Sequence, residues 1–206
     1  MTTPGIACSH ARGATGARGP TGGGIRNSPA AWSARALSVA DAHEATRWSE
    51  AGQRERFDSV LAALDPKPGE SLLDFGCGTG ALSELLPEGV DYLGYDWAAG
   101  MVMRARCEHP GRSFSRLWPD GPFDLVACIG TFNLRDGWSK EQTWKTLASL
   151  RGRCRRAIAV CLYAGKDPDC LIYSEDEIPF IAHMGEARTT VTRHRPNDLL
   201  LLMERT

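Results

Sequence analysis

The stretch ESLLDFGCGTG, residues 70–80, followed by DYLGYD, residues 91–96, decides how this chain is expected to fold. The letters LLDF form an apolar run too brief for a helix and bounded by glycines, which is typical of a buried parallel strand. Gly76, Gly78 and Gly80 follow at alternate positions, and glycine allows positive φ angles and close approach of a ligand to the backbone. The stretch therefore predicts a strand, a ligand-binding turn, a helix and a second strand.

Two carboxylates frame this turn. Asp74 lies at the end of the first predicted strand. Asp96 ends the second strand about twenty residues after Gly76, where an acid can accept both hydroxyl groups of a ribose. An adenosine-type cofactor is implied. The pattern G-x-G-x-x-G/A is shared with NAD-dependent oxidoreductases, so the glycines alone leave both classes of enzyme open.

The complete string LLDFGCGTG, with an acid two places before the first glycine, resembles motif I of the class I S-adenosylmethionine (SAM)-dependent methyltransferases. DWAAGM, residues 96–101, followed by Ala105 and Arg106, resembles that family's D-x-S-x-x-M and A-R pattern, with Ala98 in place of the serine. The resemblance implies that the glycine loop wraps the methionine part of SAM, that Asp96 binds the ribose and that the next residues border the adenine. The contacts it implies for SAM, or for the product S-adenosylhomocysteine (SAH), are Asp74, Gly76, Cys77, Gly78, Gly80, Asp96, Trp97, Met101 and Ile129.

The rest of the chain predicts an α/β fold, a Rossmann-like seven-stranded methyltransferase sheet with helices on both faces and a terminal antiparallel hairpin. A short helix is expected at 81–86 and a second one at 97–107. Capping patterns start two more helices, at Ser139 with Gln142 and at Ser174 with Glu177. The further strands are expected at 112–117, 123–129, 157–163, 189–192 and 199–203, the last two joined by turn residues.

The segment before the first strand divides into two parts. Residues 1–29 are rich in glycine and arginine and poor in large apolar groups, which predicts a disordered tail. Residues 30–206 are expected to form one methyltransferase domain with an N-terminal helical lid, 30–64, made of a short helix within 31–47 and a longer one from Ser49. WSEAGQRERF, residues 48–57, resembles a W-x4-Q-x2-R-F pattern of small stand-alone bacterial and phage methyltransferases. It would place Arg56 or Gln53 on the methionine carboxylate of SAM; a solvated helix face is the alternative.

Composition narrows the class of partner and the compartment. A chain of 206 residues is long enough for one domain and too short for a nucleotide domain with a full substrate domain. The net charge of −1 gives no field that favours nucleic acid or a membrane surface. Seven cysteines without a C-x-x-C pair suggest neither a disulfide framework nor a metal site. Without an apolar run of eighteen residues, the chain is expected to be cytoplasmic.

Methyl transfer is an in-line displacement, so the protein must mainly position two reactants and accept a proton. His43, Asn133 and Tyr163 are the candidates for a base or an orienting group, because they precede the first strand or follow strands four and five. The N/D-P-P-Y/F motif of enzymes that methylate amino groups of DNA bases is missing after strand four. A small molecule or a peptide terminus, methylated on N, O or C, is therefore the expected acceptor. A NAD-dependent oxidoreductase and a non-catalytic SAM-binding protein remain the alternatives.

Overall fold

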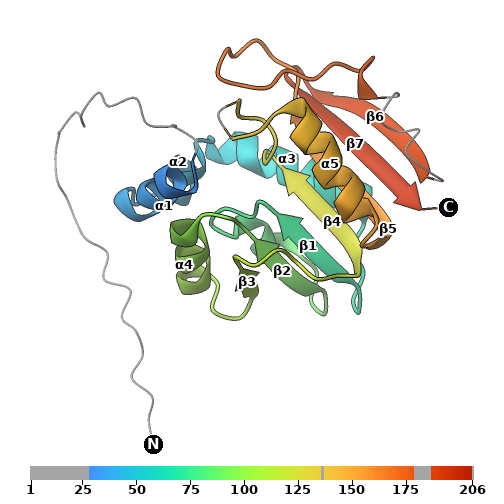
Figure 1. The fold of residues 1–206 in the computed structure, drawn as a ribbon. Coiled ribbons are helices and arrows are strands. Elements are labelled where there is room, and N and C mark those ends of the chain that lie inside the picture. Colours follow the sequence, from blue (N-terminus) through green and yellow to red (C-terminus); the bar gives the residue numbers. More distant parts are fainter. Residues whose placement is uncertain (1–27, 136, 179–186, 206) are drawn as a thin grey trace, which may run out of the picture.

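A computed structural model describes residues 28–135, 137–178 and 187–205, which form a sheet covered by helices (Figure 1). Apart from Ser28 and Pro29, the predicted tail lies outside the described residues. The helices are α1 (Pro29–Ser38), α2 (Ala42–Thr46), α3 (Glu50–Leu64), the 3-10 helix η1 (Ala81–Leu85), α4 (Ala99–Glu108) and α5 (Lys140–Arg151). The strands are β1 (Ser71–Phe75), β2 (Asp91–Tyr95), β3 (Ser113–Ser115), β4 (Phe123–Ile129), β5 (Cys154–Tyr163), β6 (Ala187–Arg195) and β7 (Asp198–Arg205).

The seven strands lie in the order β3-β2-β1-β4-β5-β7-β6. The pairs from β3 to β5 are parallel, and β7 pairs antiparallel with both β5 and β6. The predicted fold, with its terminal hairpin, is confirmed. The chain leaves β1 toward β2 and β3 on one side and returns as β4 on the other, so the strand order reverses between β1 and β4. Ligands bind beyond the carboxyl ends of the strands at such a point.

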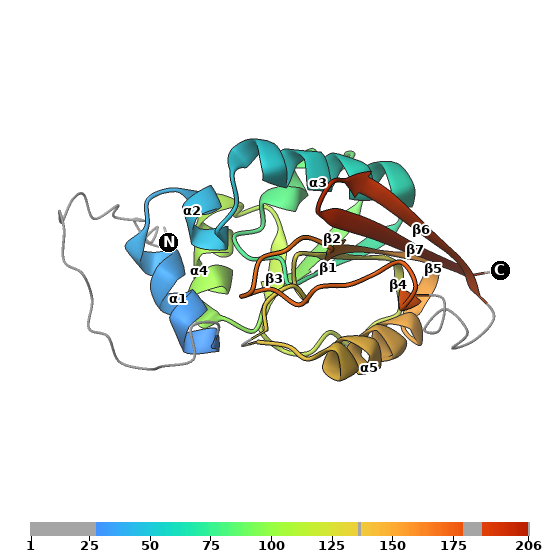
Figure 2. The same cartoon turned by 90° about the horizontal axis from the view of Figure 1, so that it is seen from above.

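Helices cover both faces of the sheet, with α3 on one side and α5 on the other (Figure 2). Phe57, Val60 and Leu64 of α3 pack in one core cluster with Leu72 of β1. Because side chains alternate along a strand, Leu73 points to the opposite face and joins the second core cluster, which includes two leucines of α5. Burial on both faces explains why β1 reads as a nearly continuous apolar run.

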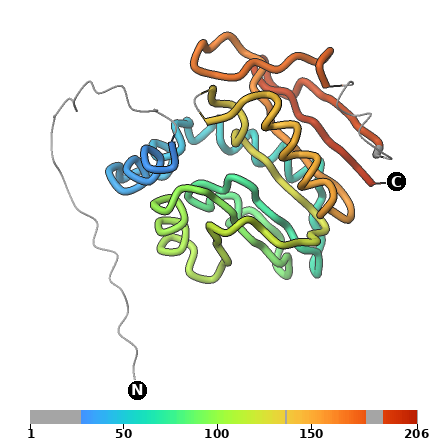
Figure 3. The backbone as a smooth tube through the Cα atoms, viewed as in Figure 1, coloured from blue at the N-terminus to red at the C-terminus, as the bar shows by residue number. Residues whose placement is uncertain are grey.

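The segment before α3 differs from the single short helix expected within 31–47. It forms two helices, α1 and α2, separated by residues 39–41. Helix α1 lies along α4 (Figure 3), and a Cβ added at Gly100 would come 2.3 Å from the carbonyl oxygen of Ser33. The Arg104 guanidinium donates to three carbonyl oxygens at the end of α1, those of Ala36, Val39 and Ala40. The last carbonyls of a helix lack partners inside it, so Arg104 both caps α1 and attaches it to α4.

One further helix departs from expectation, and another cannot be followed along its whole predicted length. The predicted helix at 81–86 is the 3-10 helix η1. The Ser174 pattern leads into a turn, in which the Glu177 amide donates to the Ser174 carbonyl. Ile178 is helical, and residues 179–186, where the predicted helix would continue, lie outside the described part. The capping box of Ser139 and Gln142 is formed at the start of α5, as predicted. No helix among the described residues has both the length and the apolar character needed to cross a membrane.

Candidate functional site

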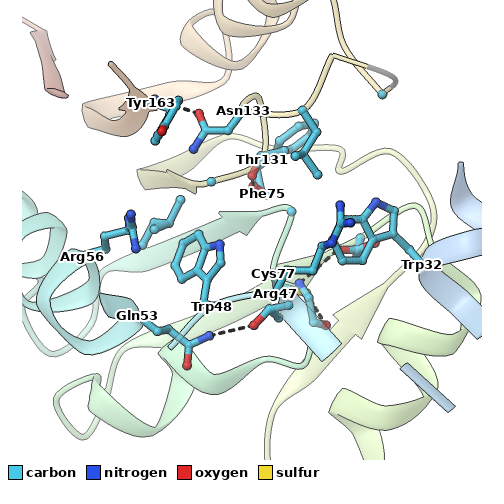
Figure 4. Close-up of a pocket in the computed structure, with 18 of the residues that line it drawn as sticks. Trp32, Arg47, Trp48, Gln53, Arg56, Phe75, Cys77, Thr131, Asn133 and Tyr163 are labelled. Carbon is cyan, nitrogen blue, oxygen red and sulfur yellow. Dashed lines mark hydrogen bonds between the residues drawn. The ribbon is translucent and has the colours of Figure 1, made fainter. Parts of the chain in front are cut away.

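A cavity of about 710 Å³ lies where the strand order reverses (Figure 4). Its floor comes from the residues that follow β1, β2, β4 and β5, and one wall comes from the end of α2 and the start of α3. Polar and aromatic side chains from separate parts of the chain meet in it. The sheet topology therefore brings the residues predicted from residues 70–101 together with residues from outside that range.

The glycine loop lies against the cavity with its backbone exposed to a ligand. Gly76, Gly78 and Gly80 all have positive φ, of 84°, 54° and 83°. A Cβ at Gly76 would come 2.2 Å from Oγ1 of Thr131, so this turn leaves no room for a side chain. Gly76 and Gly78 line the cavity, whereas Gly80 does not: a Cβ there would come 2.6 Å from the Phe114 ring. Gly80 therefore serves the turn and its packing.

Asp96 is positioned by the backbone of the glycine loop and of α4. Its Oδ2 accepts the Gly78 amide at 3.0 Å, and its Oδ1 accepts the Ala98 amide at 2.8 Å. The side chain lines the cavity although it is only 8% exposed. Burial raises the pKa of Asp96 to about 6, against the lowering effect of the two amides. Each carboxylate oxygen keeps a second lone pair, so Asp96 can still accept hydroxyl groups of a ligand.

Asp74 lies beside the same loop and is also buried. It accepts the Tyr92 hydroxyl at 2.8 Å. Burial raises the pKa of Asp74 to about 7; the Tyr92 hydrogen bond lowers it and the nearby Asp96 raises it further. Two buried carboxyl groups therefore flank the glycine loop, and both titrate close to neutral pH.

Five of the six tryptophans of the chain line the cavity. Trp97 and Trp32 pack against a small cluster that includes the predicted contact Met101. Trp97 also stacks on Trp138, with ring centroids 5.9 Å apart and planes inclined by 20°. The remaining two are Trp48 and Trp118. Aromatic faces of this kind can stack on an adenine or another flat group.

Arg56, predicted to reach a cofactor carboxylate, lines the cavity but is already paired. Its Nη2 lies 2.8 Å from Oδ2 of Asp198, its Nη1 donates to the Gly52 carbonyl at 3.0 Å, and its guanidinium stacks on Trp48. Arg195 donates to the same Gly52 carbonyl and pairs with Glu55. Arg56 is therefore part of a network that joins α3 to the β6–β7 hairpin.

Cys161, His194 and Asp198 form a cluster behind this network, with one potential ligand atom from each lying within 4.8 Å of the others. Asp198 is also the carboxylate that pairs with Arg56 and, at 3.7 Å, with Arg195. Burial raises the pKa of the Cys161 thiol to about 12, so this thiol is protonated at neutral pH. A divalent cation here would lie beside two guanidinium groups, and we interpret the cluster as the packing of an ion-pair network.

The three catalytic candidates do not lie together. Asn133 and Tyr163 both line the cavity, and the Asn133 Oδ1 accepts the Tyr163 amide at 3.0 Å (Figure 4). This bond leaves the amide nitrogen of Asn133 directed toward the cavity. The Tyr163 hydroxyl accepts the Asp167 amide at 3.2 Å. His43 does not line the cavity. Ile129, the expected contact at the end of β4, does line it.

Several lining residues were not found from the sequence as contacts. Thr46 and Arg47 end α2, and the Thr46 methyl would lie 3.1 Å from a Cβ at Gly78. Thr131 donates to the Phe75 carbonyl at 2.6 Å, immediately beside Gly76. Only Thr131 has a local sequence signal, which is the glycine that precedes it. Gly130 has a φ of 75°, and a Cβ there would come 2.2 Å from the Trp48 ring.

A family model described as a methyltransferase domain matches residues 47–151, and no curated protein matches the sequence. Among solved structures, the magnesium protoporphyrin IX methyltransferase of Synechocystis PCC 6803, with bound SAM, is 23% identical with a TM-score of 0.63. The alignment covers 76% of this chain and 81% of that one. A SAM-dependent methyltransferase of Aquifex aeolicus is 18% identical with a TM-score of 0.59, over 82% of this chain and 100% of that one.

These structures share the fold, and the family model covers the glycine loop, Asp96 and β4. The chain belongs to the methyltransferase-domain family, and the predicted resemblance of residues 70–80 to the class I SAM-dependent methyltransferases is confirmed.

Proposed function

We propose that this methyltransferase binds SAM in the cavity at the glycine loop and transfers its methyl group to an N, O or C nucleophile of a small molecule or a peptide terminus. The single observation that carries the cofactor assignment is the glycine loop with positive φ at Gly76 and Gly78, directly bonded to the buried carboxylate of Asp96. In the Synechocystis relative, crystals contain SAM or SAH.

The residues present fit this cofactor. The turn at Gly76 and Gly78 offers bare backbone to the methionine part, Asp96 offers acceptor lone pairs for a ribose, and Trp97 with Met101 offers an apolar surface for the adenine. Bound SAM would supply the activated methyl group. Ile129 and the Asn133 amide lie beyond it at the carboxyl end of β4, on the side that an acceptor would approach.

The protein's own contribution is then mainly to orient the acceptor. Asn133 is fixed through Oδ1 by the Tyr163 amide, so its amide nitrogen can donate to an acceptor from a fixed direction. The Tyr163 hydroxyl, bonded to the Asp167 amide, lines the same wall. His43 lies outside this wall, so we assign it no part in the transfer. Five of the described cysteines, Cys77, Cys128, Cys154, Cys161 and Cys170, are free thiols, which supports a cytoplasmic location.

Calorimetry and a transfer assay test the proposal. The full chain is expected to bind SAM and SAH and to show no heat with NAD. Radiolabelled SAM added to a small-molecule extract should then yield a labelled product that is absent when SAH is present in excess. Tight binding of NAD without a response to SAM would contradict the proposal. SAM binding without any labelled product from small-molecule or peptide fractions would instead support a non-catalytic SAM-binding protein.

The affinity for SAH is expected to fall at acid pH. Only the ionised Asp96 accepts both ribose hydroxyls, and its pKa in the free protein is about 6. Affinity should therefore be constant above about pH 7 and fall by about tenfold per unit below pH 6. Calorimetric titrations between pH 5 and 8 measure this dependence. In Asp96→Asn, which cannot ionise, the slope below pH 6 should flatten; an unchanged slope would assign the titration to another group.

The stability of the unliganded protein should depend on pH in the opposite direction from the affinity for SAH. The folded-state pKa values of Asp74 and Asp96 are raised above 3.8, so between about pH 4 and 7 the native state binds more protons than the unfolded state. The contribution of these two carboxyls to stability is therefore present at low pH and is lost as the pH rises through 6 to 7. Melting temperatures measured without ligand across this pH range test whether the contribution is lost as the pH rises.

A further inference from the structure

Arg47 lies at the edge of the cavity in a left-handed helix-ending conformation that leaves its backbone fixed. It ends α2 with φ 62° and ψ 29°, in the left-handed region. Among the described residues, the only other non-glycine residue with positive φ is Asp65, and aspartate tolerates this region better than arginine does. A left-handed residue is common at the end of a helix, and here the Arg47 amide donates to the Glu44 carbonyl at 3.2 Å. The left-handed turn directs the Arg47 side chain into the cavity (Figure 4).

The position of Arg47 relative to the glycine loop is fixed by its neighbour. The Thr46 methyl would lie 3.1 Å from a Cβ at Gly78, so the end of α2 rests directly on the loop. The Thr46 hydroxyl also accepts Nε2 of Gln53 at 3.4 Å, which ties the end of α2 to α3. The Arg47 guanidinium lies 6.0 Å from the centroid of the Trp32 ring, at the limit of a cation–π contact. Two helices and a ring therefore hold a cation above the loop.

The proposed cofactor needs such a cation. SAM carries a carboxylate on its methionine part, and this part is the one assigned to the glycine loop, where Asp74 and Asp96 already place two acidic groups. The other arginines that line the cavity, Arg56 and Arg195, belong to the network of Asp198 on the side of the β6–β7 hairpin. A guanidinium binds a carboxylate well because its paired N–H groups match the two oxygens.

Resting on the proposed function, we infer that Arg47 binds the methionine carboxylate of SAM, the role predicted from the sequence for Arg56 or Gln53. Arg56 acts instead as a structural cation that joins α3 to Asp198. The end of α2 is then part of the cofactor site. Thr46 lies against the glycine loop, and Arg47 binds the methionine carboxylate of the SAM that this loop holds.

Arg47→Gly tests this inference, because glycine suits φ 62° and removes the side chain without straining the backbone. Two probes separate the carboxylate from the rest of the ligand: SAH carries it, whereas 5′-methylthioadenosine has the same adenosine and lacks the amino acid part. By calorimetry, Arg47→Gly is expected to weaken SAH binding by about tenfold or more and to leave 5′-methylthioadenosine within about twofold. A thermal melt of the variant shows that it is folded under the conditions of the titration. Arg47→Lys should give an intermediate loss for SAH.

Arg54→Gln, which removes an exposed arginine of α3 paired with Asp58, is the matched control and should change neither affinity. Unchanged SAH affinity in Arg47→Gly would overturn the inference. So would an equal loss for both probes, which would show that Arg47 shapes the loop without contacting the carboxylate. If the unchanged protein binds neither probe, the proposed cofactor is wrong, and the inference fails with it.

Discussion

Asp96→Ala is expected to weaken SAM binding by roughly 10²- to 10⁴-fold. Two charge-assisted hydrogen bonds to the ribose would be lost, each contributing about 1.5–3 kcal/mol, and about 1.4 kcal/mol corresponds to a factor of ten. The structure adds a second effect that the sequence did not predict. The Asp96 oxygens also accept the Gly78 and Ala98 amides, so alanine leaves two buried donors without their partner. Each such donor costs about 1–3 kcal/mol of stability, and the melting temperature should fall as well.

Calorimetry with SAH and a thermal melt separate the two effects. Asp91→Ala is the matched control, because Asp91 begins the same strand, is exposed and lies outside the cavity. It should change neither affinity nor melting temperature appreciably. A folded Asp96→Ala protein with the affinity of the unchanged protein would show that the ribose is bound elsewhere.

Deleting residues 1–47 is expected to reduce methyl transfer by about 10²-fold or more while the sheet still folds. The deletion removes Trp32, Thr46 and Arg47 from the cavity wall, and misplacement of a bound reactant by even 1 Å can cost about 10²-fold in rate. Because α1 packs on α4 and not over β4 and β5, the first loss should be in the affinity for SAM. We propose that the helical lid predicted at 30–64 covers the cofactor, because α1 packs with α4 and the end of α2 lies against the glycine loop.

A shorter deletion, of residues 1–27, is the control. It retains Ser28, whose hydroxyl accepts the Ala31 amide at the start of α1, and it should leave melting temperature and turnover nearly unchanged. A third variant, Gly100→Val, tests the contact between α1 and α4 without removing any residue. Its side chain would meet the Ser33 backbone, so α1 must move away from α4, and SAM affinity should fall. Full activity in the long deletion would place the whole reaction site in the rest of the cavity.

The sequence predicted those features that depend on neighbouring residues. The strand at 71–75, the glycine turn, the capping box at Ser139 and the hairpin of β6 and β7 all follow from local patterns, and all are present. The separation of α1 from α2 was missed because the Arg104 contacts that cap α1 come from a helix more than sixty residues later. Hydrophobic periodicity carries no information about such distant caps.

The residues of the site were likewise predicted only where local sequence patterns define them. Asp96 and Gly76 could be found because motif and spacing define them, whereas Thr131 and Trp138 reach the cavity only after β4 has paired with β1. The sequence offered Arg56 as a cofactor contact because it does not reveal the partner of this side chain. That partner, Asp198, lies on a distant strand that only the tertiary structure brings close. A charged side chain on a helix has no local signal that tells a ligand contact from an ion pair.

The network that joins α3 to the hairpin bears on the order of folding. Arg195 donates to the Gly52 carbonyl across 143 residues of sequence, and Arg56 meets Asp198 across a similar interval. Contacts between residues so far apart in sequence form late, because closing a long loop costs chain entropy before the contact energy is gained. The start of α3, and with it Trp48 on the cavity wall, should therefore be the last part to become rigid during refolding. Cofactor binding would then be acquired after most of the native secondary structure, as a slow step that stopped-flow measurements can resolve.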